Sequence, residues 1–243
     1  MSRLLAIDAG NTRIKWGIHD GAAWCATGSV ATREPHGLAS VLAAHGGVAR
    51  AIASNVAGEA VDQELARVAE ALGARLRRVQ PQAREAGVVN GYRDAGQLGP
   101  DRWAALVAAR ASGAGPQVVA TAGTALTVDA LSAAGEFLGG LIVPGPALMR
   151  RALESATARL RETEGRDADY PASTPDAITS GAIQACVGAI AGMVERLARR
   201  EGARPHVLLS GGAAREISAR LALPHAIRDN LVLDGLVELD RHG

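Results

Sequence analysis

A strand–turn–strand pattern occurs twice in this chain, at positions 113 residues apart. Residues 7–12 read Ile-Asp-Ala-Gly-Asn-Thr, and residues 120–125 read Ala-Thr-Ala-Gly-Thr-Ala. Each copy lies between two apolar runs, which is typical of a strand that enters a tight turn and returns. Because the offset is nearly half of the 243 residues, the pattern indicates an internal duplication.

The two copies lie on either side of a small, glycine-rich segment at residues 112–116. Apolar runs and periodic stretches predict strands in both halves, at residues 4–8, 14–18, 24–30, 51–55, 118–121, 126–131 and 207–210. Further stretches predict helices at residues 34–45, 59–72, 101–110 and 177–200. We therefore expect an α/β protein with two similar domains, residues 1–115 and 116–243.

Composition excludes several classes of protein. The chain has only two cysteines, Cys25 and Cys186, which excludes a disulfide scaffold. Its net charge of +1 does not favour nucleic acid or an anionic membrane as a partner. The first residues are charged too early for a signal peptide, so we expect a cytoplasmic protein.

One uncharged stretch, residues 177–194, is about long enough to span a bilayer. It contains Thr179, Ser180 and Gln184 and several glycines, so we expect a buried helix of a soluble protein instead. Gly188 and Gly192 form a pair of small residues that permits close helix contact, either within the fold or between two subunits.

The two glycine–threonine turns are candidates for a phosphate-binding cleft, because backbone N–H groups in such turns bind phosphate oxygens. Asp8 would hold Mg²⁺ directly or through water, and Lys15 would bind phosphate. Lys15 is the only lysine among 26 basic residues, and a compact ammonium binds where a planar guanidinium does not fit. The alternative is that Gly10 and Gly123 only permit hairpins.

Two further segments are candidates for chemistry. Asp101 is at the start of a predicted helix beside Arg102, and both features favour an ionised carboxylate that could act as a base. The glycines of residues 210–213 would let an adenine ring approach the backbone. Capping of an ordinary helix explains either segment equally well.

These motifs together resemble the type III pantothenate kinase family, also described as Bvg accessory factor-like. The resemblance covers the whole chain and is carried by residues 8–12, 99–102, 121–125 and 139–145, in that order. It implies two ribonuclease-H-like domains of the actin and sugar-kinase type, with mixed sheets flanked by helices. It also implies a homodimer that uses ATP with Mg²⁺ to phosphorylate pantothenate to 4′-phosphopantothenate, the first step of coenzyme A synthesis.

The family's functional residues map onto matching positions of this sequence. For ATP the resemblance implies Asp8, Ala9, Gly10, Asn11, Thr12, Arg13, Ile14, Lys15, Thr124, Gly211 and Gly212. For pantothenate it implies Tyr92, Gly99, Pro100, Asp101, Arg102 and Thr174, with Asp101 as the catalytic base.

One position departs from the family pattern. Many members have an aspartate in the second phosphate motif that contributes to a potassium or ammonium site, and this sequence has Thr121. We expect a weaker monovalent-cation requirement, because a hydroxyl lacks the charge attraction of a carboxylate. Two alternatives stay open: an ATP-binding regulatory or accessory protein without turnover, and a kinase of another small hydroxy acid.

Overall fold

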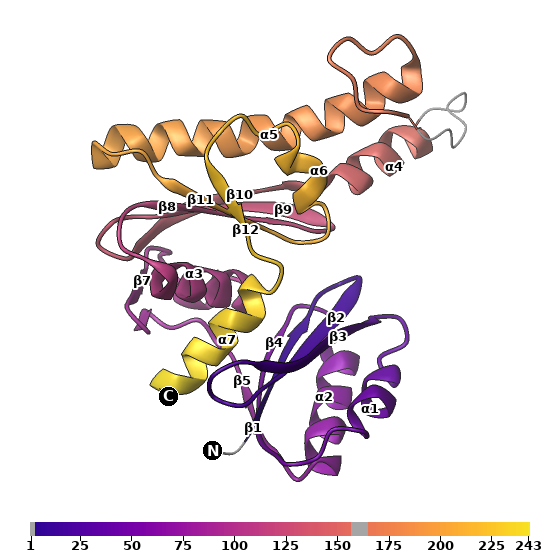
Figure 1. Cartoon of the computed structure of the whole chain (residues 1–243), viewed down its shortest axis with the longest axis vertical. Helices are drawn as coiled ribbons and strands as arrows, with labels where there is room; N and C mark the ends of the chain where they lie inside the picture. Colours follow the sequence, from indigo (N-terminus) through magenta and orange to yellow (C-terminus); the bar gives the residue numbers. More distant parts are fainter. Residues whose placement is uncertain (1–2, 157–164) are drawn as a thin grey trace. The chain divides into compact units, whose positions relative to one another are not determined.

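The computed structural model describes residues 3–156 and 165–243. The chain forms two compact units (Figure 1), here called the first unit, Met1–Gly113 with Asn230–Gly243, and the second unit, Ala114–Asp229. The expected division at 115/116 therefore differs from the structure for the last residues of the chain. They form a helix, α7 (Leu231–His242), that belongs to the first unit.

The physical reason is close packing of α7 on helix α3 (Pro100–Ser112). A Cβ on Gly235 would lie 1.8 Å from the backbone oxygen of Ala104, so the two helices are in backbone contact there. The indole nitrogen of Trp24 also donates a hydrogen bond of 2.9 Å to Asp234. Neither contact has a local sequence signal, which is why the boundary was expected elsewhere.

The first unit contains one mixed sheet and its helices. Its strands are β1 (Arg3–Ala9), β2 (Arg13–His19), β3 (Trp24–Ala31), β4 (Val48–Asn55) and β5 (Arg75–Arg78), in the order β3-β2-β1-β4-β5. The other elements are α1 (Gly37–Leu42), α2 (Glu59–Ala71), the hairpin β6 (Arg84–Glu85) and β7 (Val88–Asn90), and the 3₁₀ turn η1 (Ala95–Gln97). The strands expected at residues 4–8, 14–18 and 24–30 are confirmed as β1, β2 and β3, which pair antiparallel as a meander.

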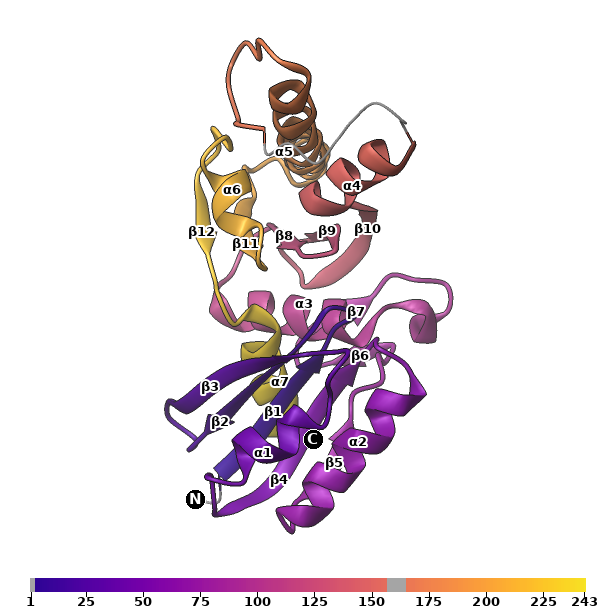
Figure 2. The ribbon, with the colours of Figure 1, turned by 90° about the vertical axis from the view of Figure 1, so that its right-hand side faces the viewer.

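Helices cover both faces of this sheet. Figure 2 shows α1 and α2 on one face and α7 on the other. Alternate strand residues such as Leu5, Ile7 and Ile14 pack with Leu38 and Leu65 from the helices on the first face. The period of two in the strands therefore buries apolar side chains on both faces, as a doubly covered sheet requires.

The second unit has a sheet of the same topology. Its strands are β8 (Gln117–Ala122), β9 (Ala125–Leu131), β10 (Glu136–Pro144), β11 (His206–Ser210) and β12 (His225–Ile227). In both units the first strand pairs antiparallel with the next strand and parallel with the strand that follows the intervening helices. The order β12-β11-β8-β9-β10 repeats β5-β4-β1-β2-β3, so the shared topology agrees with the expected duplication.

In the described part of the second unit the helices are α4 (Pro146–Ala156), α5 (Thr174–Glu201) and α6 (Ala214–Ser218). Within the described residues, α5 alone is long and apolar enough to span a membrane by length and composition. One face of it, including Cys186, Ile190 and Leu197, packs on the sheet, while Gln184 and Gly188 are exposed. The expected core helix is thus buried along one face only.

Candidate active site

Asp8 lies near the end of β1, beside the end of the parallel strand β4. The Ser54 hydroxyl donates a hydrogen bond of 2.9 Å to its carboxylate. Burial raises the pKa of Asp8 to about 6; the bond from Ser54 and the charge of Lys15 lower it, while the charge of Asp101 raises it. The charges of Lys15 and Asp101, two other groups of the predicted site, therefore both act on Asp8 within the first unit.

The first glycine turn connects β1 to β2. It closes with a backbone hydrogen bond of 3.1 Å from the Gly10 N–H to the Arg13 oxygen, and Asn11 and Thr12 are exposed at its tip. Lys15 lies directly opposite Asp8 in the antiparallel register. The side chain of Ile14 is fully buried, so only its backbone is available to a ligand.

Asp101 occupies the first turn of α3, after Gly99 and Pro100. A negative charge there interacts favourably with the helix dipole. A Cβ on Gly99 would lie 2.5 Å from a carboxylate oxygen of Asp101, so a glycine leaves the space that this carboxylate occupies. The motif at residues 99–102 thus places an acidic group at a helix start.

Two of the predicted substrate residues contact each other. Arg102 is buried, and its guanidinium donates a hydrogen bond of 3.0 Å to the Tyr92 hydroxyl. The Arg102 guanidinium carbon also lies 5.7 Å from the centre of the Tyr92 ring, a cation–π distance. The loop that contains Tyr92, near η1, is therefore fixed to the start of α3.

The second glycine turn, between β8 and β9, is packed by backbone on two sides. A Cβ on Gly145, just before α4, would lie 2.1 Å from the Gly123 oxygen. A Cβ on Gly211, just after β11, would lie 2.3 Å from the Ala122 oxygen. The Gly145 N–H donates to Thr124 at 2.8 Å. Residues 210–213, the candidate adenine segment, therefore lie next to the second phosphate motif, residues 121–125, in this unit.

Thr121 lies beside another residue with a hydroxyl side chain. In the parallel register of β8 and β11 it lies next to Ser210. The described residues at the ends of these two strands, Thr121, Ala122 and Ser210, include no carboxylate in place of the missing aspartate.

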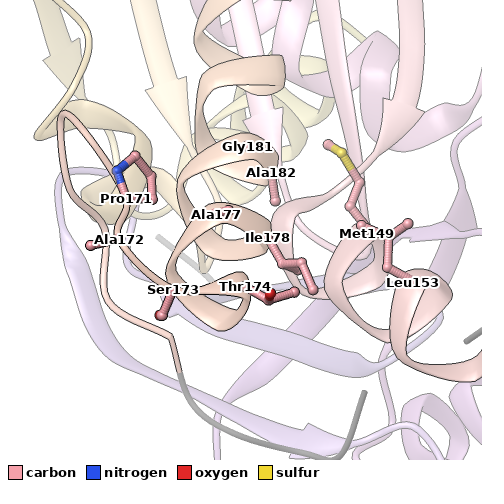
Figure 3. A pocket seen from close by; sticks show the side chains of 10 residues that line it. All are labelled: Met149, Leu153, Pro171, Ala172, Ser173, Thr174, Ala177, Ile178, Gly181 and Ala182. Carbon is pink, nitrogen blue, oxygen red and sulfur yellow. The ribbon is translucent and has the colours of Figure 1, made fainter. Parts of the chain in front are cut away.

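Thr174, the remaining predicted substrate residue, lines a pocket of about 760 Å³. Figure 3 shows Met149 and Leu153 of α4 on one side and residues of α5 on the other. The segment before α5 contributes the lining residues Pro171, Ala172 and Ser173. Apolar walls with a few hydroxyl groups are typical of small-molecule sites.

Sequence reasoning missed Ser54, near the end of the parallel strand β4, and included Ser210, at the end of β11, only as the first residue of the candidate adenine segment. A usable signal exists, because ligands of open α/β sheets bind beyond the carboxyl ends of parallel strands. Finding these residues would have required pairing β4 with β1 and β11 with β8, and neither pair is adjacent in sequence.

The donor set suits Mg²⁺ better than a metal held by protein ligands alone. The described residues include no group of three or more His, Cys, Asp or Glu side chains placed to bind a metal. Mg²⁺ in phosphate chemistry commonly uses one or two carboxylates with water and substrate phosphates. A buried carboxylate with an acidic neighbour, as Asp8 is, fits that role.

Comparisons with solved structures confirm the fold. A Baf family protein from Campylobacter jejuni has a TM-score of 0.64 at 18% identity, covering 98% of this chain and 97% of its own. A glucokinase from an Antarctic psychrotroph has a TM-score of 0.50 at 11% identity, covering 99% of both chains. The expected two-domain fold of the sugar-kinase type is therefore confirmed.

Comparisons of sequence show the family. A model described as type III pantothenate kinase matches residues 4–196. The type III pantothenate kinase of Aromatoleum aromaticum is 45% identical over 238 residues, which is 98% of either chain. That of Dechloromonas aromatica is 42% identical over 236 residues, covering 97% of this chain and 98% of its own. With both the family model and full-length relatives in agreement, the chain belongs to the type III pantothenate kinase family.

Proposed function

We infer that this protein transfers the terminal phosphoryl group of ATP to the primary hydroxyl of pantothenate. The product is 4′-phosphopantothenate, and the reaction is the first step of coenzyme A synthesis. Family membership supports the reaction. The observation that carries the residue assignment is the position of Asp8, which lies opposite Lys15 in the strand register and whose pKa responds to the charges of both Lys15 and Asp101.

Asp101 acts as the base in this proposal. The pantothenate oxygen forms a bond to the γ-phosphorus as the bond from phosphorus to the ADP oxygen breaks, and the hydroxyl proton moves to the Asp101 carboxylate. Such a base can accept the proton late, because phosphoryl transfer depends mainly on positioning and on neutralisation of charge. The carboxylate lies in the first turn of α3 and occupies space that a side chain at Gly99 would fill.

The remaining residues bind the two substrates. Lys15 and the N–H groups of the two glycine turns hold phosphate oxygens, with Gly211 and Gly212 beside the adenosine. Asp8 holds Mg²⁺, which neutralises phosphate charge when it is bound. For pantothenate the proposal names Tyr92 and Arg102 in the first unit, and Thr174 with the pocket that it lines in the second. The hydroxyl and apolar lining of that pocket suits a hydroxy acid with methyl groups.

The test is pantothenate-dependent ATP consumption by the wild type and by Asp101→Asn. Loss of a general base lowers kcat by about 10²–10⁴-fold, and we expect a fall in that range. Asp20→Asn is the control, because Asp20 is an exposed aspartate in the loop between β2 and β3. Turnover of another hydroxy acid, or ATP binding without turnover, would favour the two alternative functions instead.

The same assay, run in potassium, ammonium or sodium salts, tests the role of Thr121. We propose a monovalent-cation requirement that is weak, since Thr121 and its neighbour Ser210 offer neutral oxygens only. Thr121→Asp is then expected to strengthen the dependence on potassium. A tight and absolute requirement in the wild type would contradict this proposal.

A homodimer is also part of the proposal, with the exposed face of α5 as its seam. This face holds the small or uncharged residues Gly181, Gln184, Ala185 and Gly188. Gly188→Glu would place a charge in the seam, so we expect monomers by light scattering. Ala222→Glu, at another exposed position of the second unit, serves as the control. An unchanged dimer in both variants would exclude this seam.

No role for nucleic acid or a membrane is proposed, and the expected location is the cytoplasm.

A further inference from the structure

The segment from α6 to Leu221 forms ion pairs with residues on both sides of the pocket that Thr174 lines. Glu216 accepts a hydrogen bond of 2.7 Å from Arg150 of α4, the helix that forms one wall. Arg220 donates to Asp167 from Nε and to Asp169 from a terminal nitrogen. Both aspartates precede the lining residues Pro171 and Ala172, so these ion pairs reach the opposite wall.

Residues 165–173, here called the pocket loop, fold back on the start of α5. A Cβ on Gly165 would lie 2.0 Å from the Pro175 oxygen, so the loop touches the helix backbone there. The Arg166 N–H donates to Asp176 at 2.6 Å, and the Ala168 N–H donates to Ser180 at 3.0 Å. These contacts attach the loop to its own helix, whereas Arg220 attaches it to a different element of the unit.

The contact between Arg220 and Asp167 is better shielded than an ordinary surface ion pair. The side chains of Arg220 and Asp167 are 25% and 23% exposed. By contrast, Arg215 of α6 and Asp229 are 79% and 73% exposed and lie 3.8 Å apart, a pair of little expected energetic value. Arg220 uses two different nitrogens for two carboxylates, which fixes its orientation as well as its position.

We propose that Arg220 and Glu216 are positioning residues that hold the two walls of the acceptor pocket, the pocket loop and α4, in the arrangement that binds the acceptor. The inference rests on the proposed function of that pocket. Neither side chain is among the lining residues, so both act through the wall residues that they attach. Loss of the attachment therefore raises the KM for the acceptor and leaves the transfer step unchanged.

Arg220→Met is the test variant, and Arg215→Met is its matched control on the same segment. We expect Arg220→Met to raise the KM for pantothenate about 10-fold, with kcat and the KM for ATP within about twofold of the wild type. Arg220→Lys retains a single donor group in place of the two-nitrogen fork, so its KM should be intermediate. Arg215→Met should change none of these values.

Hydrogen exchange of the pocket loop gives a readout that needs no substrate. Arg220→Met should speed exchange at the Ala168 amide, while Arg215→Met should not. If the wild type fails to use pantothenate, the proposed function fails, and the exchange result still decides whether Arg220 holds the loop. Should Arg220→Met not fold, Asp169→Asn removes only the more exposed half of the contact.

The inference is overturned if Arg220→Met matches Arg215→Met in kinetics and exchange. A joint loss of kcat and of affinity for both substrates, with a lower melting temperature, would also overturn it, since that pattern indicates general destabilisation of the unit.

Discussion

The two glycine turns of this chain share a topology and differ in what surrounds them. The turn after β1 has charged groups beside it, with Asp8 and Lys15 opposite each other on its two strands. The turn after β8 has the hydroxyl residues Thr121 and Thr127 at a facing pair of its two strands. Its own neighbours are backbone atoms, with Gly145 and Gly211 both in close contact.

This difference shows how a duplicated unit can divide one task. The same strand–turn–strand backbone presents N–H groups in both units, because that property depends on the turn and not on its side chains. The facing pair beside the first turn is charged, Asp8 with Lys15, and Asp101 also acts on Asp8, whereas the facing pair beside the second turn is neutral. The second unit holds its turn through close backbone packing, so we expect its function to depend more on glycine than on charge.

Substitution of glycine gives the largest expected contrast between the turns. Gly211 has a φ of +97°, and its Cβ would lie 2.3 Å from the Ala122 oxygen, so Gly211→Ala should lower the free energy of unfolding by about 3 kcal/mol or more. Gly10→Ala meets the Arg13 oxygen at 3.2 Å and should cost about 1 kcal/mol. Denaturant unfolding of both variants measures the contrast.

Gly212→Ala is the matched control, because an added Cβ there meets nothing within 4 Å. We expect a change below about 0.5 kcal/mol. Equal losses for Gly211→Ala and Gly10→Ala would show that the two turns are held in the same way.

The buried charge of the first unit predicts a pH dependence of stability. The pKa of Asp8 in the folded state is about 6, against an ordinary value of 3.8, so the folded state holds this proton more tightly. The resulting stability is fully present below pH 3.8 and is lost as the pH rises through about 6. Asp8→Asn removes this dependence, so without Mg²⁺ the variant should gain up to ~3 kcal/mol on the wild type between pH 4 and pH 7.

Asp20→Asn is the control for this pH effect. Backbone hydrogen bonds from Ala23 and Ala22 lower the pKa of Asp20, so its ionisation favours folding. Unfolding curves at pH 4 and pH 7 should therefore separate the two variants. If the free energy of unfolding of Asp8→Asn and of the wild type changed by the same amount between pH 4 and pH 7, ionisation of Asp8 would not destabilise the folded state.

Much of the fold was predictable because its signals are local. Alternation of apolar residues predicted the strands β1, β2 and β3, and the repeat predicted two similar sheets. The helix expected at residues 34–45 is shorter, Gly37–Leu42, with turn residues on both sides. The position of α7 was missed because it depends on packing against α3, which is far away in sequence.

The candidate site shows the same limit. Residues within one motif, such as Gly99 and Asp101, were found because the geometry of a helix start is encoded locally. The bond between Ser54 and Asp8, and the contacts of Arg220 with the pocket loop, join segments that only the folded chain brings together. Motif reading finds the groups that do chemistry, while their partners require the pairing of strands and loops.

The smallest expected effect concerns Lys15, which distinguishes the charged turn from the neutral one. The ammonium of Lys15 forms no salt bridge or hydrogen bond with any of the described residues, although its charge lowers the pKa of Asp8. An ammonium left without a carboxylate partner is available to phosphate. Lys15→Met should therefore lower kcat/KM for ATP about 10-fold, and Lys15→Arg should restore little because a guanidinium differs in size and geometry.

Arg33→Met, which removes a highly exposed cation of the same unit, should leave kcat/KM unchanged. Equal effects of Lys15→Met and Arg33→Met would mean that general charge, and not the ammonium beside the first turn, attracts the nucleotide.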